Sequence, residues 1–575
     1  MIVLGLSNND YAGVCLIIDG IIVSAAHEER FTRIKAHSTF PQQAIDYVLS
    51  ENNLKLDDID LIAYGWKAGF NEYKHLELYF DRIAEASIRE PQSLPYLRHR
   101  LYDEIHNDTE KRQEFDRYIQ DNALGSKVVY IDHHEAHANA AFLCSPFSNG
   151  ITISCDGRGD FQSLTVSEYT NGQFNVLHRE TTFDSLGYFY GRITKLLGFK
   201  PNRHEGKITG LASYGDPKKL LPLMAEFIDI NEEGRIRAKF GTGYLPSYHN
   251  DYDVLQARFA NEKPEDIAAA AQQHLENILT AIVKQYVSNK NPQNLCLAGG
   301  VFGNVKLNQR LRELDGVKNI YVLPSMGDDG LPLGSAVCAL YNRTGLRVKT
   351  PSMKIGPNIE TSEEIITQIE SNSQYACIKS DQAHTIVKII NALKNNKVLG
   401  FAKGRMEFGP RALCSRSIVC SAKDVTINKW LNERMNRTEF MPFAPITADV
   451  FASDCFVGWK SEHIASHFMT VTYDCTEYFA LRCPAVTHID RTARPQVITQ
   501  HSDPFMFKIL VEWEASSGEP SLINTSFNIH EEPIINNMHH ALANLDRGVV
   551  DILVFNEDLL VWNSKNVQLG ELLHG

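Results

Sequence analysis

The sequence predicts an α/β protein in which one strand–loop–strand pattern occurs twice, followed by a further α/β domain. The first copy begins with Met1–Leu6, a β-rich apolar run that ends in the polar loop Ser7–Asp10. The second begins with Ile151–Cys155, another β-branched strand, and ends in the loop Asp156–Asp160. In both copies two more strands follow, joined by an Asp-Gly or Asn-Gly turn typical of a β-hairpin. We therefore predict two related halves that face each other; the alternative is two unrelated hairpins.

Composition indicates a folded multidomain protein and excludes several classes. The chain has 575 residues, of which 43% are hydrophobic and 22% charged, and its formal net charge is −13. This acidic balance argues against nucleic acid as a partner. Because no run of eighteen apolar residues exists, we expect no membrane span. The eleven cysteines include no Cys-x-x-Cys pair, so we expect reduced core thiols in a cytoplasmic protein.

The segments that complete the first domain are mostly helical. Phe40–Glu51 and Glu72–Gln120 have helical periodicity, and Pro264–Val287 is a strongly amphipathic helix. The last of these leads into strand Asn294–Leu297 and the glycine turn Ala298–Asn304. A strand that ends in two glycines before a helix can present backbone N–H groups to a phosphate or nucleoside.

A third acidic loop and a domain boundary come next. Strand Ile320–Leu323 ends in the loop Pro324–Gly330, and the small-residue helix Gly334–Tyr341 follows. Around Arg347–Asn358 the pattern changes to Lys, Pro, Ser and Gly. We therefore predict a first domain of residues 1–350 and a second of residues 351–575.

Two histidines at the start of an Ala-rich run are candidate metal ligands. His133 and His137 are four residues apart, so on a helix both rings project from one face. Asp156 stands at the end of the strand that begins about twenty residues later. Two imidazoles and a carboxylate suit a hard-to-borderline metal. The zinc-protease HExxH pattern does not match, because the acid is Glu135; the alternative is histidines that hydrogen-bond locally and an aspartate that caps a turn.

The second domain contains a basic loop beside glycine and proline. Lys403, Arg405, Arg411 and Arg416 lie among apolar pairs, which favours an anion pocket over a solvated face. Late in the chain, a strand ends in the polar segment Asn524–Asn528.

Four segments together resemble the NodU/CmcH/TobZ-type O-carbamoyltransferase family. They are His204–Gly215, Gly404–Ile418, His488–Gln496 and Asn524–Ile534. The resemblance covers effectively the whole chain. It implies a duplicated, ribonuclease H-like ASKHA domain, similar to actin and to TsaD, followed by a YrdC-like α/β domain.

The family resemblance implies an ATP-dependent O-carbamoyltransferase. The YrdC-like domain would form carbamoyl-AMP from carbamoyl phosphate and ATP. The TsaD-like domain would transfer the carbamoyl group to a hydroxyl of a small-molecule acceptor, such as a natural product or sugar. The implied cofactors are ATP, Mg²⁺ and a divalent transition metal, with Fe²⁺ first.

The same resemblance assigns residues to three sites. The implied metal ligands are His133, His137, Asp156 and Asp328. The implied nucleotide contacts in the first domain are Lys207, Gly210, Gly300 and Asn304. The implied ATP or carbamoyl phosphate contacts in the second domain are Lys403, Arg405, Arg411, Arg416, Arg437, Arg494, Asn524, Ser526 and Asn528.

Several choices stay open from the sequence. We rank Asp10 first as the general base, with His27 and His204 as alternatives if either lies near the acceptor. His134 could replace His133 as a ligand. The chain also departs from the family pattern, which usually has Gly-Asn at Cys414-Ser415, Gly at Glu531 and Arg at Met441.

Three other functions compete with this interpretation. A tRNA threonylcarbamoylation-type enzyme shares both domain types, but the acidic charge and the lack of basic patches argue against an RNA acceptor. An ASKHA small-molecule kinase would not explain the arginine loop, and a non-catalytic scaffold would not explain the retained acids and arginines. We expect no nucleic acid or membrane partner, and we keep a homodimer open.

Overall fold

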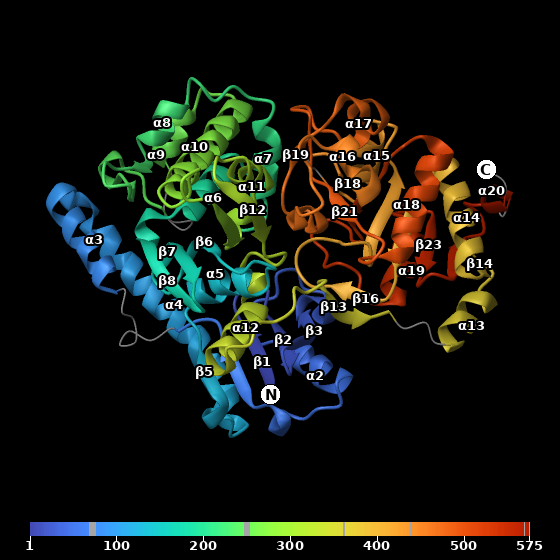
Figure 1. Cartoon of the computed structure of the whole chain (residues 1–575), viewed down its shortest axis with the longest axis horizontal. Helices are drawn as coiled ribbons and strands as arrows, with labels where there is room; N and C mark the ends of the chain where they lie inside the picture. Colours follow the sequence, from blue (N-terminus) through green and yellow to red (C-terminus); the bar gives the residue numbers. More distant parts are fainter. Residues whose placement is uncertain (68–75, 247–252, 360–362, 438–439, 569, 574–575) are drawn as a thin grey trace. The chain divides into compact units, whose positions relative to one another are not determined.

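The computed structural model describes residues 1–67, 76–246, 253–359, 363–437, 440–568 and 570–573. The chain divides into two compact units (Figure 1). The first unit comprises Met1–Val23 and Ser38–Thr350, and the second comprises Ser24–His37 and Pro351–Gly575. The early segment Ser24–His37 therefore groups with the C-terminal residues, although it lies within the range 1–350 that the sequence assigned to one domain.

Contacts inside the second unit explain this grouping. The Arg33 guanidinium donates to the Pro533 and Ile534 carbonyls, at 2.7 Å each. The Arg30 guanidinium donates to the Gly409 carbonyl at 3.3 Å. No local pattern of the sequence predicts pairings across hundreds of residues.

The first unit contains two five-stranded sheets. The first sheet has the order β3-β2-β1-β4-β5, with bounds β1 (Ile2–Ser7), β2 (Gly13–Ile18), β3 (Ile21–His27), β4 (Leu61–Tyr64) and β5 (Val128–Tyr130). The last four residues of β3, from Ser24 to His27, group with the second unit. The second has the order β12-β11-β6-β7-β8, with bounds β6 (Gly150–Gly159), β7 (Gln162–Thr170), β8 (Gln173–Thr181), β11 (Gln293–Ala298) and β12 (Val317–Val322). A small hairpin consists of β9 (Ile228–Ile230) and β10 (Ile236–Ala238).

The two sheets repeat one topology. In each, the first strand of an antiparallel meander pairs on its other side with a parallel strand, as β1 pairs with β4 and β6 with β11. One more parallel strand, β5 or β12, completes the sheet. The predicted duplication is therefore present as two sheets of identical strand order, and the α/β class is confirmed.

Helices cover these sheets and fill the connections. Those of the first unit are α2 (Gln42–Glu51), α3 (Leu76–Arg89), α4 (Leu94–Asp121), α5 (His133–Leu143), α6 (Leu186–Leu196), α7 (Glu205–Ala212), α8 (Leu221–Ala225), α9 (Asp253–Phe259), α10 (Pro264–Lys284), α11 (Val305–Arg312) and α12 (Leu331–Thr344). Helices α5 and α12 pack against each other (Figure 1); α5 also packs on β6 and β11, and α12 on β1 and β4. Each follows the last strand of one sheet and packs on the other sheet, which joins the two halves. Residues 72–75 of the predicted helix Glu72–Gln120 lie outside the described residues.

The second unit is built on one eight-stranded mixed sheet of order β14-β24-β23-β15-β17-β22-β18-β21. These strands are β14 (Tyr375–Lys379), β15 (Leu399–Ala402), β17 (Arg416–Ser421), β18 (Ala444–Ala448), β21 (Gln496–Ile498), β22 (Ser521–Ser526), β23 (Ile552–Phe555) and β24 (Leu559–Asn563). Two pairs stand apart, β13 (Lys354–Asn358) with β16 (Arg405–Glu407) and β19 (Tyr473–Asp474) with β20 (Thr492–Ala493).

Helices of the second unit complete its hydrophobic core. They are α1 (Glu29–Thr32), α13 (Glu363–Ser371), α14 (Gln382–Lys394), α15 (Ile427–Arg434), α16 (Asp449–Cys455), α17 (Glu477–Arg482), α18 (Pro504–Ser517), α19 (Met538–Asp546) and α20 (Gly570–Leu573). Helices α14 and α18 lie on the same face of the sheet and bury Ile389, Leu393, Ile509 and Trp513 against Phe401 and its neighbours.

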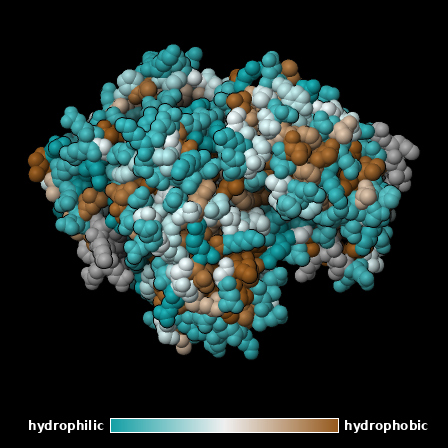
Figure 2. All heavy atoms as spheres, viewed as in Figure 1, coloured by the Kyte–Doolittle hydropathy of each residue, from teal (hydrophilic) through white to brown (hydrophobic). Residues whose placement is uncertain are grey.

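The surface and the thiols fit a folded, water-exposed chain. Hydrophilic residues cover most of the face drawn in Figure 2, and hydrophobic residues are scattered in small groups. All eleven cysteines are free, and nine of them are buried, as predicted for core thiols. Among the described helices, none is long and apolar enough for a membrane span.

Candidate functional site

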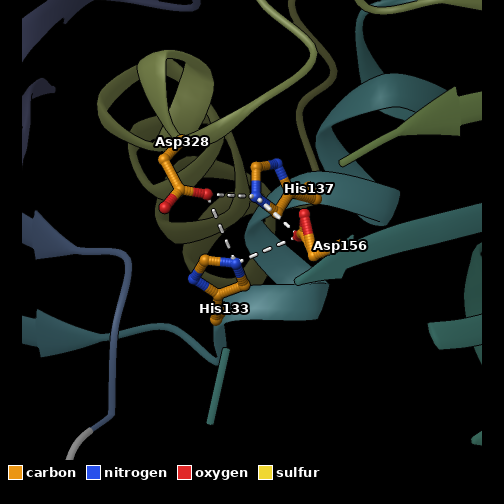
Figure 3. Close-up of side chains that lie close together, drawn as sticks. All are labelled: His133, His137, Asp156 and Asp328. Atoms are coloured by element: carbon orange, nitrogen blue, oxygen red, sulfur yellow. Dashed lines mark hydrogen bonds and ion pairs between the residues drawn. The ribbon is translucent and has the colours of Figure 1, made fainter. Parts of the chain in front are cut away.

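Four side chains of the first unit converge on one point, as Figure 3 shows. The Nε2 atoms of His133 and His137 lie 3.2 and 3.3 Å from Oδ2 of Asp156. The same two nitrogens lie 3.7 and 3.4 Å from Oδ1 of Asp328. All four donor atoms lie within 4.8 Å of one another. The structure therefore brings together all four residues that the family resemblance implied as metal ligands.

Local structure explains the position of the histidines. Asp132 caps α5 by accepting the Glu135 N–H at 3.1 Å, and Asp160 accepts the His133 N–H at 2.8 Å. From this fixed helix start, His133 and His137 project from one face. His134 is buried outside the four-residue cluster. Of these two histidines, His133 belongs to the cluster and His134 does not.

The carboxylates come from corresponding ends of two strands. Asp156 lies in β6, which continues to Gly159 beyond an irregularity in its pairing with β7, so the strand does not end at Cys155 as predicted. Asp328 begins a short 3₁₀ turn after β12. Because β6, β11 and β12 are parallel, their carboxyl ends meet at one edge of the sheet.

Burial makes this cluster a plausible cation site. Both imidazoles and Asp156 are buried, whereas the Asp328 side chain is 28% exposed and leaves one open side. Burial lowers the pKa of His133 to about 3, so its ring is neutral. Burial also acts to lower the pKa of His137, but Asp156 and Asp328 raise it above its ordinary value. Two imidazole nitrogens and two carboxylate oxygens match a divalent transition metal such as Fe²⁺ or Zn²⁺.

Several backbone contacts hold Asp156 in place. Its Oδ1 accepts the Gly300 N–H at 3.0 Å, and its carbonyl accepts the Ser185 hydroxyl at 3.0 Å. Gly187 packs so closely that a Cβ there would lie 2.5 Å from the Asp156 carbonyl. Gly299 has φ +95°, a conformation that favours glycine. The glycine turn predicted to face a phosphate thus directs the Gly300 N–H to a metal-ligand candidate.

The other predicted nucleotide contacts lie on neighbouring helices of the first unit. Asn304 caps α11 by accepting the Leu307 N–H at 3.1 Å, and its amide pairs with the Gln272 amide at 2.8 and 3.1 Å. Lys207 and Gly210 are buried in α7, and the Lys207 ammonium lies 5.7 Å from the Phe199 ring centroid.

The three general-base candidates lie in different places. Asp10 follows β1, and desolvation together with the negative charge of Asp328 raises its pKa above the ordinary value. His204 belongs to the first unit, where its Nδ1 accepts the Lys200 N–H at 3.2 Å. His27 belongs to the second unit, where its ring stacks on Phe408 at 4.3 Å. Asp10 is thus within electrostatic range of Asp328, one of the metal-ligand candidates.

Three of the predicted anion contacts of the second unit come together. The Arg437 guanidinium donates to the Ser526 hydroxyl at 2.9 Å and to Oδ1 of Asn528 at 2.8 Å. It also donates to the Thr525 hydroxyl at 2.8 Å. Asn524 lies one residue earlier in β22, where its amide N–H donates to Oε1 of Gln496 at 2.7 Å. Arg411 and Arg494 are half-buried in loops of the same unit.

Arg405 and Arg416 are engaged by backbone carbonyls. The fully buried Arg416 guanidinium donates to four carbonyls, those of Pro357, Lys403, Gly404 and Ser415. Arg405 donates to the Ile355 and Gly356 carbonyls, at 2.8 and 3.1 Å. In this conformation both arginines hold β13 to the basic loop, a role that the sequence did not predict.

Lys403 belongs to a buried ionic group that the sequence analysis missed. The Asp503 carboxylate accepts from the Lys403 and Lys354 ammonium groups, at 2.7 Å each. Lys354, Lys403 and Arg405 line a cavity of about 430 Å³. Lys354 lies where the sequence indicated a linker, and the only sequence signal for Asp503 is its position before Pro504, typical of a helix start.

Two departures from the family pattern share one backbone property. Cys414 has φ 72° and Glu531 has φ 63°, at the two positions where the family resemblance implied glycine. In this left-handed region only glycine avoids a steric cost. The backbone conformation at both positions therefore fits the glycine that the resemblance implied.

Comparisons with known proteins agree with the geometry. The family model "Carbamoyltransferase N-terminus" matches residues 3–337, and "Carbamoyltransferase C-terminus" matches residues 390–561. The chain is 30% identical to the uncharacterized protein MJ1051 of Methanocaldococcus jannaschii, over 97% of this chain and 99% of that one. It is 26% identical to nodulation protein U of Rhizobium tropici, over 92% of this chain and 91% of that one.

A solved structure, HypF of T. kodakarensis, aligns with a TM-score of 0.31 and 14% identity, over 60% of this chain and 48% of that one, a similarity too low to bear on function. The two family models, by contrast, cover most of the sequence from its first strand to β24. The chain therefore belongs to the carbamoyltransferase family and is a carbamoyltransferase.

Proposed function

We propose that the protein is an ATP-dependent O-carbamoyltransferase whose transfer step takes place at the cluster of His133, His137, Asp156 and Asp328. The convergence of these four side chains within 4.8 Å, in a chain of this family, carries the proposal. Fe²⁺ is the metal we expect there. When bound, a divalent cation would polarise the carbamoyl carbonyl and offset phosphate charge.

The acceptor hydroxyl must lose a proton, and Asp10 supplies a base. Its raised pKa improves its match to a proton acceptor at neutral pH, and it lies within electrostatic range of Asp328. Attack on carbamoyl-AMP would then release AMP. His27, which stacks on Phe408 in the second unit, and His204, whose Nδ1 is engaged by Lys200, are weaker candidates.

In the second unit we propose that carbamoyl phosphate, water and Mg-ATP react to give carbamoyl-AMP, inorganic phosphate and pyrophosphate. Arg437 donates hydrogen bonds to Ser526 and Asn528, and Lys403 and Arg405 line the cavity. Cationic groups in an enclosed site stabilise phosphate charge as it develops. Because Arg405 and Arg416 donate to carbonyls in this conformation, Arg437 and Lys403 are the better targets for mutagenesis.

We further propose a small hydroxyl-bearing acceptor, a natural product or a sugar. The acidic net charge disfavours the tRNA alternative, and the four-residue cluster together with the family match disfavours a kinase. Eleven free thiols fit a reducing compartment such as the cytoplasm.

The two half-reactions can be tested separately. The purified full chain is incubated with ATP, carbamoyl phosphate and Mg²⁺, and carbamoyl-AMP is followed by mass spectrometry beside pyrophosphate release. We expect adenylate from the wild type and from His137→Gln, but at least a tenfold loss with Arg437→Gln.

Metal content tests the first unit. We expect bound iron in the wild type and in His134→Gln, which alters a buried histidine of the same helix outside the cluster, but not in His137→Gln. Failure of the wild type to form carbamoyl-AMP while it binds ATP would refute the proposed mechanism. Equal metal content in the two histidine variants would refute the proposed metal site.

A further inference from the structure

A half-buried arginine lies beside the metal cluster and has no role in the proposed chemistry so far. Arg158 stands between Asp156, a ligand candidate, and Asp160, which accepts the His133 N–H. Its guanidinium lies 5.5 Å from the Trp66 ring centroid. The same Trp66 also packs edge-to-face against the His133 ring, with 4.4 Å between the ring centroids. Arg158 and His133 therefore share one aromatic neighbour at the centre.

Helix α4 presents a buried charged stripe to this arginine. Arg100, Glu104 and Asp108 recur every four residues and are all buried. Asp108 Oδ1 lies 2.7 Å from a terminal nitrogen of Arg158, and the Arg100–Glu104 ion pair measures 3.1 Å. A buried carboxylate at this distance holds the guanidinium in one place. Because the Arg158 side chain is still 20% exposed and a guanidinium has five N–H donors, it can also bind an anion.

Negative charge gathers near the metal cluster, and a cation beside it favours binding of a phosphate. Asp156 and Asp328 contribute two carboxylates to the cluster, and Asp10 is a third carboxylate within electrostatic range of Asp328. A divalent cation would offset two of these charges, and the third would repel a phosphate. Arg158 acts electrostatically on both Asp10 and His133, and Lys111 and Arg203 also act on Asp10.

We propose that Arg158 binds the phosphate of the nucleotide at the metal centre and that Asp108 on α4 is its positioning residue. This inference rests on the proposed function, since it takes the adenosine phosphate of carbamoyl-AMP to bind in the first unit. A planar guanidinium held over Trp66 contacts two phosphate oxygens at once, which a lysine cannot do.

The test uses the full chain and AMP as the probe, because AMP carries the phosphate without the labile carbamoyl group. Binding of radiolabelled AMP is measured by equilibrium dialysis with and without Fe²⁺ under anaerobic conditions. The share of AMP binding that depends on Fe²⁺ reports on the site in the first unit. The His137→Gln variant measures the share of AMP binding that does not need the metal. Metal content and unfolding temperature are recorded for every variant.

We expect Arg158→Gln to keep its metal and to weaken metal-dependent AMP binding by tenfold or more. Arg158→Lys should fall between this variant and the wild type, and Asp108→Asn should lose about threefold. The matched control is Arg235→Gln, which alters a half-buried arginine paired with Glu180 at 3.2 Å and should bind AMP as the wild type does. If Arg158→Gln does not fold, the double variant with Asp108→Asn removes both partners of the ion pair and takes its place.

The outcomes separate the two proposals. Wild-type-like AMP binding by a folded, metal-loaded Arg158→Gln protein would overturn the role of Arg158 and leave the carbamoyl-transfer proposal standing. A wild type without any metal-dependent AMP binding would overturn both.

Discussion

Replacing Asp503 by asparagine should destabilise the second unit strongly. The buried carboxylate accepts from Lys403 and Lys354, at 2.7 Å each, and its Oδ1 caps α18 by accepting the Met506 N–H at 3.0 Å. Asparagine keeps the cap but leaves two ammonium groups without their anion. Breaking a buried ion pair costs about 3–5 kcal/mol. Because the Lys354 side chain is 22% exposed and can reach water, we expect about 3–4 kcal/mol.

Urea unfolding followed by tryptophan emission measures this loss. Four of the five tryptophans belong to the second unit, and Trp513 lies on α18 itself. With an m-value of about 2 kcal/mol per molar urea, the midpoint should fall by about 1.5–2 M. The matched control is Asp381→Asn, since Asp381 caps α14 in the same unit but is exposed. This control should change the midpoint by less than about 0.3 M.

The pH dependence of the urea midpoint tests whether the ion pairs of Asp503 with Lys403 and Lys354 cause this loss of stability. Burial acts to raise the pKa of Asp503, but Lys403 and Lys354 together lower it below its ordinary value. A carboxyl with a lowered pKa stabilises the fold above its unfolded pKa, and this contribution is lost as the pH falls through the folded value. The difference between wild type and Asp503→Asn should therefore shrink in acid. Equal midpoints for Asp503→Asn and Asp381→Asn at neutral pH would refute the reasoning.

Three further predictions concern backbone strain, close packing and thiols. Glu531→Gly should raise the free energy of unfolding by about 0.5–1 kcal/mol, because the exposed Glu531 has φ 63°. Cys414→Gly should lower the free energy of unfolding instead, because the buried Cys414 side chain would lose its packing. Urea midpoints that shift in the same direction for both variants would contradict this pair of predictions. Gly159→Ala should reduce metal content measured by mass spectrometry, because a Cβ there would lie 2.0 Å from the His133 ring, whereas Gly206→Ala, in open space, should not. Ellman's reagent should modify at most two cysteines of the native protein quickly, because nine are buried and burial raises the pKa of half-buried Cys475 to about 12. Fast modification of more than two thiols would contradict the burial of the other nine.

Local patterns in the sequence predicted most of the architecture around the site. Alternating and β-branched runs marked β1 and β6, and the Asp-Gly and Asn-Gly turns marked the following hairpins. The spacing of His133 and His137 predicted two rings on one helix face. The family resemblance then supplied Asp328, which no local pattern connects with the histidines.

Other residues were misplaced or missed because their roles depend on partners far along the chain. The dense arginines indicated an anion pocket, yet Arg416 donates to four backbone carbonyls. Asp503 pairs with lysines about 100 and 149 residues away. Arg158 stood in a predicted loop, but only the packing of α4 shows that Asp108 holds it. A charged residue looks the same in sequence whether it faces solvent, substrate or a buried partner.

By itself, the sequence determined the α/β class, the repeated half and the pair of histidines, because strand and helix periodicities are local properties of the chain. Only the tertiary structure decided which histidines face the carboxylates, since consecutive helix residues point about 100° apart and packing on β6 and β11 selects the face. It also decided that Asp156 and Asp328, 172 residues apart, share one edge of a sheet. Parallel pairing of β6, β11 and β12 brings their carboxyl ends together, and the chemistry of the site follows from that pairing.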